Sequence, residues 1–341
     1  MKAAVVERPH DLVVRDLSDP EPGPYDALCR MLYGATCAGT DRHIIKGRFP
    51  FPCIDYPTIL GHESIGRVVE VGAKVRNYKA GDLITRVGAP AIDGVNISWG
   101  GFAELGIARD HAAMQADGIA ADEWESYRTN QVLPGNFDPR AATMIITWRE
   151  TFSFITRMGV GQGARVLVVG SGGNGFAYAA HARNLGATAV ALVGNDARRQ
   201  QAEALGVDAY VDYKADDVVD QLQAAGGAFD YIIDAVGRET SLTSVLPCLA
   251  DGGTLAIYGI DDVGACKFAP QDVGKSFRFF NGGYDEPEAH DRVVAFIQAG
   301  QLDAAKFMDL DAPYDLSSIN DAFQAIEDRV AAKVLIKLSP A

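Results

Sequence analysis

The stretch 166–175, VLVVGSGGNG, is the feature that most narrows what this chain can fold into. Four apolar residues typical of a buried strand lead directly into a glycine array, and a helical pattern follows it. In a GxGxxG array the first glycine permits a tight turn, the second lets backbone N–H groups approach a pyrophosphate, and the third lets helix and strand pack closely. The stretch therefore predicts a dinucleotide site at Gly170, Gly172, Gly173, Asn174 and Gly175.

Strand-like and helix-like segments alternate around this array. Apolar runs typical of strands cover 164–170, 189–194, 208–213, 230–237 and 253–259, and helical spacing covers 140–159, 174–186 and 196–206. Such alternation predicts βαβ units on a parallel sheet. Two amphipathic helices at 290–302 and 319–330 and a last strand at 331–338 are expected to follow.

The chain before residue 110 has a different pattern. Its apolar runs are short, alternate with polar residues and are separated by Gly, Pro and Asp; they cover 1–6, 11–17, 27–37, 63–75, 82–87 and 102–108. This pattern predicts the strands of a compact β-rich domain. Since 341 residues exceed what a single core usually fills, we expect two domains.

The composition excludes several classes of partner. With 48% apolar and 22% charged residues, the chain is typical of a folded globular protein. Its net charge is −14, and no cluster of Lys and Arg offers attraction to nucleic acid or to an anionic membrane. No segment reaches the ~18 apolar residues of a membrane span, and Glu7 and Arg8 interrupt the first apolar run. We therefore expect a cytoplasmic protein.

The stretches GATCAGTDRH at 34–43 and LGHES at 60–64 contain candidate metal ligands. A thiolate from Cys37 and an imidazole from His62 suit Zn²⁺, and catalytic zinc sites keep three protein ligands and one open position. Judged one by one, a lone cysteine is more often a small core hydrophobe, and His43 is more often a surface residue. The five cysteines include no CxxC pair, so the remaining ones are expected to be ordinary thiols: Cys29, Cys53, Cys248 and Cys266.

The end of the second predicted strand bears on the choice of cofactor. NAD-binding folds usually place an acid there, roughly 20 residues past the glycines, to bind the ribose 2′-hydroxyl. This chain has Gly194, which leaves room for a 2′-phosphate, and Asn195, Arg198 and Arg199 could bind that phosphate. The pattern favours NADP over NAD. The alternative is that the arginines lie on a solvated helix face and that Asp196 binds the ribose.

In their order along the chain, these motifs resemble the medium-chain dehydrogenase/reductase family, specifically its zinc alcohol and polyol dehydrogenases of the sorbitol, threonine and glucose dehydrogenase kind. The resemblance covers nearly the whole length and rests on CAGTDRH, LGHESIGRVVEVGAKVRNYKAGD, WGGFAEL, VLVVGSGGNG, DYIIDAVG, DGGTLAIYG and KVLIKL. It implies an α/β protein: a GroES-like β-barrel catalytic domain, residues 1–150 and 285–341, plus a Rossmann domain with a doubly wound parallel sheet, residues 151–284.

The resemblance also implies roles for single residues. Cys37, His62 and Glu63 would hold one catalytic zinc, with Glu63 either a direct ligand or exchanging with water. Thr40 would accept the proton of the substrate hydroxyl and pass it, through the cofactor ribose, to His43. Val236 and Gly237 would contact the cofactor. The family's second, structural zinc is expected to be absent, because residues 85–110 contain no cysteine.

Two departures from the family pattern bear on the metal. Cys37 precedes Thr40 by one residue more than usual, so that Ala38 occupies the ligand position when counted back from the following Asp. We favour an insertion that keeps Cys37 in place, because Gly39 tolerates an altered turn. Where relatives have a further Cys or Glu, this chain has Ile146 and Thr147; Glu150, one helical turn later, could reach the metal or its water, or be structural.

The predicted reaction is the reversible oxidation of a secondary alcohol, on a polyol, sugar or related hydroxylated compound, with hydride transfer to NAD(P)⁺. Trp99, Trp148 and Phe49 could line the substrate cleft or pack in the core, and residues 281–287 could shape the cleft. One alternative is a zinc-independent NADPH quinone or enone reductase on the same fold, which His62 and Glu63 disfavour. Another is a non-catalytic dinucleotide-binding protein. Relatives of this kind are commonly dimers or tetramers, so we expect a homo-oligomer.

Overall fold

The computed structural model describes residues 1–51, 54–263 and 267–339. The chain divides by its internal contacts into two compact units. The first unit consists of Met1–Ile146 together with Met308–Ala341, and the second of Thr147–Phe307. The sequence analysis placed domain boundaries at 150/151 and 284/285, and those boundaries stay a prediction. Cys53 and Cys266, expected to be ordinary thiols, lie outside the described residues.

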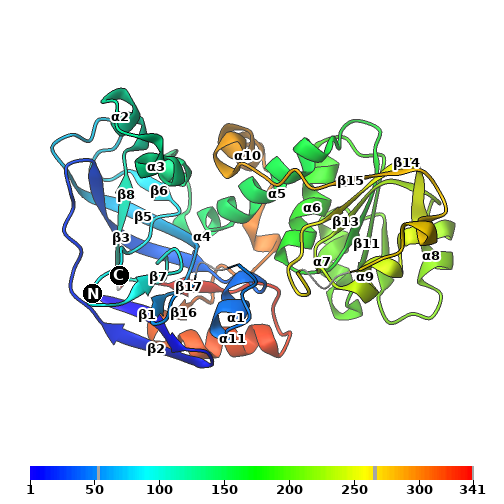
Figure 1. The fold of residues 1–341 in the computed structure, drawn as a ribbon, viewed down its shortest axis with the longest axis horizontal. Coiled ribbons are helices and arrows are strands. Elements are labelled where there is room, and N and C mark those ends of the chain that lie inside the picture. The colour runs from blue at the N-terminus through cyan, green and yellow to red at the C-terminus, as the bar shows by residue number, and fades with distance from the viewer. Residues whose placement is uncertain (52–53, 264–266, 340–341) are drawn as a thin grey trace. The chain divides into compact units, whose positions relative to one another are not determined.

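The first unit is built from two sheets (Figure 1). The smaller sheet has the strand order β2-β1-β4-β7, and the larger has the order β16-β17-β3-β5-β6-β9 with β8 paired to β3. The strands are β1 Lys2–Arg8, β2 Asp11–Asp16, β3 Asp26–Ala35, β4 Thr58–Ile59, β5 Glu63–Val71, β6 Leu83–Thr85, β7 Asn96–Ile97, β8 Leu105–Arg109, β9 Val132–Leu133, β16 Tyr314–Asp315 and β17 Leu335–Lys337. The helices are α1 Thr40–Ile45, α2 His111–Ala116, α3 Ala121–Trp124, α4 Pro139–Ala142 and α11 Ile319–Glu327.

The last strand closes this unit by pairing with one of the first. In the antiparallel ladder of β17 and β3, Leu335 lies opposite Ala35 and Ile336 opposite Gly34. Both strands contribute to one buried apolar cluster, in which Met31 of β3 and Ile336 of β17 are fully buried. Burial of apolar surface from both ends of the chain therefore makes the first unit discontinuous in sequence.

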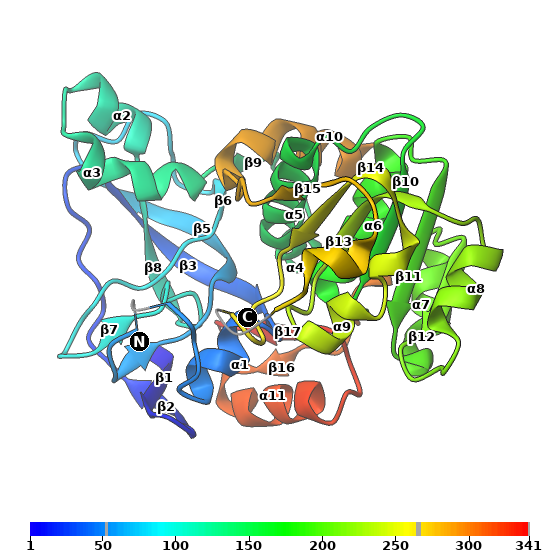
Figure 2. The same cartoon turned by 45° about the vertical axis from the view of Figure 1, so that its right-hand side comes forward.

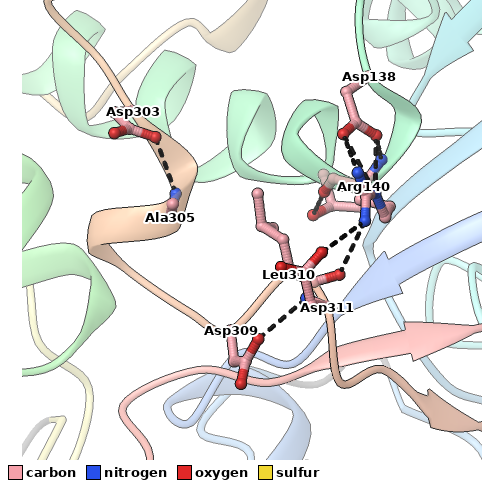
Figure 3. Close-up of polar contacts among 8 residues, drawn as sticks. Asp138, Arg140, Asp303, Ala305, Asp309, Leu310 and Asp311 are labelled. Carbon is pink, nitrogen blue, oxygen red and sulfur yellow. Dashed lines mark hydrogen bonds and ion pairs between the residues drawn. The ribbon is translucent and has the colours of Figure 1, made fainter.

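A polar network fixes the segment that returns to the first unit at Met308. The guanidinium of Arg140 in α4 donates to the Asp138 carboxylate at 2.7 Å, to Asp311 at 2.9 Å and to the backbone oxygen of Leu310 at 3.4 Å (Figure 3). The hydrogen bonds from Arg140 to Asp138 raise the pKa of the arginine above its ordinary value. Arg140 thus connects α4 to the returning segment through charge-assisted hydrogen bonds.

The second unit is a six-stranded parallel sheet with the order β12-β11-β10-β13-β14-β15. Figure 2 shows α6 alongside β10 and β11, which it contacts. The strands are β10 Arg165–Val169, β11 Ala189–Gly194, β12 Ala209–Asp212, β13 Phe229–Asp234, β14 Leu249–Ile257 and β15 Phe277–Phe280. The helices are α5 Met144–Met158, whose first three residues belong to the first unit, α6 Gly173–Asn184, α7 Arg199–Ala204, α8 Val218–Ala224, α9 Glu239–Thr243 and α10 His290–Gln298. Of the helices described, none has the length and apolar character needed to cross a membrane.

The strand order of this sheet reverses between β10 and β13. Ligands of such folds bind outside the carboxyl ends of the strands at this switch point. The expected α/β class with a parallel sheet is confirmed, and the strands predicted at 164–170, 189–194, 208–213, 230–237 and 253–259 are β10 to β14. The helix expected over 140–159 is divided, because α4 ends at Ala142 and α5 begins at Met144.

Candidate active site

Three candidate metal ligands converge in the first unit. The ligand atoms of Cys37, His62 and Glu63 all lie within 4.8 Å of one another. The pairing of β3 with β5 explains this, because Ala35 lies opposite Glu63, and the chain beyond Ala35 therefore passes beside His62. His62 and Glu63 are buried and Cys37 is half-buried. A thiolate, an imidazole and a carboxylate at this spacing form a donor set that suits Zn²⁺.

Asp41 orients two of these three residues, and the sequence analysis missed it. One carboxylate oxygen lies 3.2 Å from Nδ1 of His62, and the other accepts the backbone N–H of Cys37 at 2.8 Å. Asp41 is fully buried. A carboxylate behind a ligating histidine fixes the imidazole so that the other nitrogen, Nε2 in this case, faces the metal position. The acid that directly follows Thr40 in GTDRH was the available signal.

The buried charges alter the proton affinities of this cluster. Burial alone would lower the pKa of His62, but the Asp41 carboxylate and the Cys37 thiol raise it well above the ordinary 6.5. Burial raises the pKa of Glu63, and the Lys333 ammonium partly offsets that effect. Since a metal binds the neutral imidazole, metal binding at this cluster would release a proton from His62.

Lys333 is a second residue that the sequence analysis missed. Its ammonium forms an ion pair with the Glu63 carboxylate and donates to the backbone oxygen of Thr36 at 3.0 Å. Both charged side chains are 3% exposed. A buried lysine needs a partner, and this one balances the charge of a candidate metal ligand. The signal in the sequence was a single lysine at the start of the apolar run KVLI.

The structure places the side chain of Cys37, rather than that of Ala38, at the cluster. Ala38 packs against the apolar core of the first unit. Gly39 has an ordinary φ of −71°, and a Cβ at that position would meet nothing within 4 Å, so the turn does not use the conformational freedom of the glycine. Two hydrogen bonds between Cys37 and Asp41 hold the turn: the Asp41 N–H donates to the Cys37 backbone oxygen at 3.1 Å, and the Cys37 N–H donates to the Asp41 carboxylate at 2.8 Å.

The two predicted relay residues lie on the helix that begins next to this cluster. Thr40 is the first residue of α1, and His43 lies one turn later on the same helix. Residues three apart share a helix face. Nδ1 of His43 lies 2.5 Å from the backbone oxygen of Gly39, so Nδ1 is the donor in this contact.

The glycine array of the second unit has the expected geometry. Gly170 has a φ of +110°, and a Cβ on Gly175 would lie 1.8 Å from the Gly170 oxygen, so these two glycines are required by the turn and by the close packing of α6 on β10. At Gly172 a Cβ would meet nothing within 4 Å. The open space beside Gly172, at the start of α6, fits the pyrophosphate of a dinucleotide. Gly173 and Asn174 form the first turn of this helix.

The surroundings of Gly194 correct one expectation about the cofactor. A Cβ on Gly194 would lie 2.5 Å from Ser171 Cβ and 2.5 Å from Tyr210 Oη. The absence of a side chain at Gly194 therefore makes room for Ser171 and Tyr210, and not for the 2′-phosphate that the sequence analysis expected there. Asn195 caps the next helical turn through its side-chain oxygen, which accepts the Ala197 N–H at 3.2 Å.

The two arginines of this region differ in their partners. Arg199 forms an ion pair with Asp196 at 2.8 Å, so Asp196 already has a cationic partner. Arg199 also donates to the backbone oxygen of Tyr210 at 2.7 Å. Arg198 donates to the backbone oxygen of Ser171, within the glycine array, at 2.9 Å. Arg198 is therefore the arginine that lies beside the dinucleotide loop.

Asp234 organises the turn that carries Val236 and Gly237. Its Oδ1 accepts the backbone N–H groups of Val236 at 2.8 Å and Gly237 at 3.1 Å. Burial raises the pKa of Asp234 to about 6, against the effect of these hydrogen bonds. A Cβ on Gly237 would lie 2.2 Å from the Gly259 oxygen, so the turn is closely packed at the end of β13.

The predicted site residues on α5 are buried within the protein. Trp148 is fully buried and packs edge-on against Phe307, which makes it a core residue rather than part of a substrate cleft. Ile146 and Thr147 are also fully buried. Glu150 is 8% exposed and accepts a hydrogen bond from the Tyr258 hydroxyl at 3.2 Å within the second unit.

Comparison with known proteins agrees with this geometry. Residues 23–119 match the family model of the alcohol dehydrogenase GroES-like domain, and residues 173–295 match that of the zinc-binding dehydrogenases. The chain is 26% identical to L-galactonate-5-dehydrogenase of Escherichia coli K12, covering 99% of this chain and 98% of that protein. It is also 26% identical to L-threonine 3-dehydrogenase of Paraburkholderia phytofirmans, covering 98% of each.

The fold is also similar to that of solved structures. A zinc-binding dehydrogenase of Sinorhizobium meliloti, solved bound to NADP, matches with a TM-score of 0.79 and 24% identity, over 98% of each chain. The family models occur in the order that the two units require, and the relatives match the chain from end to end. The chain therefore belongs to the medium-chain dehydrogenase/reductase family, in its zinc-type alcohol and polyol dehydrogenase branch.

Proposed function

We propose that the protein oxidises a secondary alcohol reversibly, with Cys37, His62 and Glu63 holding one zinc ion and the second unit holding NAD(P). The observation that carries the proposal is the convergence of these three donors. Asp41 contacts two of them, through Nδ1 of His62 and the backbone N–H of Cys37. The relatives named above act on hydroxylated compounds, which supports a polyol, sugar or related substrate. Zinc bound at this position would supply a Lewis acid that lowers the pKa of the substrate hydroxyl.

The residues around the donors have distinct proposed roles. Asp41 holds the imidazole of His62 with Nε2 toward the metal position, and Lys333 balances the charge of Glu63. Thr40 accepts the proton of the substrate hydroxyl, and His43, which lies one turn later on α1, takes up that proton.

The proposed cofactor is NADP in preference to NAD. Arg198 beside the glycine array supplies the cationic donor that a 2′-phosphate requires. Tyr213 and Lys214, which follow β12, are further candidates: the Tyr213 N–H donates to the Gly194 oxygen at 3.0 Å, and both side chains are exposed. An exposed ring and an ammonium beside the tip of β11 suit an adenine and its neighbouring phosphate.

The test is an absorbance assay for reduced nicotinamide, with sugars, polyols and amino alcohols as substrates and with each cofactor in turn. We expect turnover that a chelator abolishes and added zinc restores, with about one zinc per chain in the purified protein. A chelator-insensitive reduction of quinones or enones by NADPH, in protein without zinc, would instead establish the zinc-independent reductase. The homo-oligomeric state and the cytoplasmic location stay predictions.

A further inference from the structure

The helix α1 is too short to fix its own position. It has six residues, Thr40–Ile45, and a helix of that length is only marginally stable in water without tertiary contacts. The relay candidates Thr40 and His43 both lie on this helix. The contacts between α1 and the rest of the first unit therefore decide where these two side chains lie.

Two hydrogen bonds attach α1 to the chain segment 56–62, one near each end of the helix. Near the amino end, the Asp41 carboxylate lies 3.2 Å from Nδ1 of His62. At the carboxyl end, the Tyr56 hydroxyl donates to the backbone oxygen of Ile44 at 2.6 Å. Tyr56 and His62 belong to one segment, because β4 lies between them in the chain. The helix is thus tied at two points to the segment that carries a candidate metal ligand.

The residues on both sides of the Tyr56 hydrogen bond are held by packing. Thr58 and Ile59 of β4 pair with β1 and are fully buried. The ring of Tyr56 packs against the apolar core of the first unit, and Ile44 is a fully buried member of that core. Since cores are close-packed, the hydrogen bond joins two elements that have little freedom to move separately.

The ion pairs on the outer side of α1 are weaker supports. Lys46, directly after the helix, pairs with Glu327 of α11 at 2.9 Å, and the Arg42 guanidinium lies 3.8 Å from the same carboxylate. These three side chains are 30–35% exposed, and ion pairs with such access to solvent contribute little. The Tyr56 hydroxyl is better shielded, and burial raises its pKa, so it stays protonated and able to donate at neutral pH.

We infer that Tyr56 is a positioning residue for the proton relay. Tyr56 and Asp41 fix the two ends of α1 on the segment 56–62, and this attachment sets the position of His43 relative to the candidate metal ligands. The inference rests on the proposed function. Proton transfer requires groups within hydrogen-bond reach, and a displacement of about 1 Å can lower a rate by about 100-fold. Loss of the hydroxyl would release the last turn of α1, while Asp41 still holds His62.

Tyr56→Phe tests the inference, because it keeps the ring and removes only the hydroxyl. In the zinc-loaded enzyme at pH 7 we expect kcat to fall by about tenfold, with the zinc content and the KM for the cofactor unchanged. The loss should shrink as the pH rises, because hydroxide then takes up the proton that the relay would carry. The solvent isotope effect on kcat should increase, since proton transfer becomes slower. A general loss of structure would lower kcat without this dependence on pH.

Tyr78→Phe is the matched control. The Tyr78 hydroxyl also donates to a backbone oxygen of the first unit, that of Asn130 at 2.8 Å. Its loss should lower Tm without changing the pH dependence of kcat or the solvent isotope effect. A second measurement does not depend on turnover. Amide hydrogen exchange over residues 43–48 of the zinc-loaded protein should be roughly fivefold faster in Tyr56→Phe than in the wild type, and unchanged in Tyr78→Phe.

A wild-type kcat in Tyr56→Phe would overturn the inference, even with faster exchange in α1, and so would a loss of equal size at every pH. In either case the proposed alcohol oxidation would stand. If no alcohol reduces either cofactor in wild-type protein with a full complement of zinc, then the proposed function fails and the relay role of Tyr56 fails with it. The exchange measurement separates the two, since it reports on the attachment of α1 alone.

Discussion

The Asp41 carboxylate lies 3.2 Å from Nδ1 of His62, and both side chains are buried. This contact determines which imidazole nitrogen is available to a metal. The same carboxylate accepts the backbone N–H of Cys37, so one residue positions two donors that belong to different turns of the chain. The metal site depends on this support as well as on its three ligands.

Asp41→Asn should weaken zinc binding by roughly 10- to 100-fold, because the amide is a poorer partner for the imidazole than the carboxylate. Competition with a chromogenic chelator would measure the change in Kd. Asp16→Asn, at the exposed end of β2, is the control for loss of one negative charge in the same unit. An unchanged Kd in Asp41→Asn would show that the carboxylate does not support the metal.

The thiolate donor should be Cys37 and not a residue at position 38. Cys37→Ser should lower the zinc content of the purified protein, since an alcohol is a much weaker ligand than a thiolate. The double variant Cys37→Ala with Ala38→Cys should also contain less zinc than the wild type, because the side chain at position 38 packs against the apolar core and not at the metal site. Zinc measured at wild-type content in the double variant would contradict this assignment.

Lys333→Met should destabilise the metal-free protein by about 3–5 kcal/mol, because it leaves the Glu63 carboxylate buried without its cation. Urea unfolding would measure the loss. The double variant Glu63→Gln with Lys333→Met should be less destabilised than Lys333→Met alone, since the buried charge is then removed. Lys337→Met is the control, because Lys337 lies in β17, four residues after Lys333, and is only half-buried. Equal losses for Lys333→Met and for the double variant would argue against the ion pair.

Arg198→Ala should raise the KM for NADP by about tenfold or more and change that for NAD far less, since it removes a charge-assisted hydrogen bond to the 2′-phosphate. Arg199→Ala is the contrasting variant, because Arg199 is already paired with Asp196. Initial rates at varied NADP and NAD concentrations would give the KM for each cofactor in both variants. A loss of similar size for NADP and NAD in Arg198→Ala would show that the arginine supports the loop rather than selecting the cofactor.

His181 should make the second unit sensitive to acid. It is fully buried, its Nε2 donates to the Trp148 oxygen at 3.0 Å, and burial lowers its pKa from 6.5 to about 3. The unfolded chain therefore takes up this proton first, and stability falls as the pH drops below 6.5 toward 3. Between pH 7 and pH 4.5 the loss from this group is roughly 2–3 kcal/mol. His181→Gln cannot titrate, so urea unfolding should show a smaller loss between these pH values than in the wild type.

Much of the fold could be predicted from local pattern. The strands β10 to β14 are apolar runs bounded by turn residues, and α6 begins within a glycine array that stands between a strand and a helical pattern. The short strands β4, β7, β9 and β16 could not be predicted, because two residues carry no periodic signal and each strand is defined only by its partner. The edge strand β15 was also missed, since Arg278 interrupts its apolar run.

The sequence alone determined the dinucleotide loop through its glycine spacing, and the family through the order of its motifs. The three metal-ligand candidates followed from that resemblance. Only the tertiary structure decided what lies around them. Asp41 reaches His62 because β3 pairs with β5 and Ala35 lies opposite Glu63. Lys333 reaches Glu63 across 270 positions because β17 pairs with β3. Partners so distant in sequence are brought together by burial and strand pairing, which leave no local pattern from which they could have been inferred.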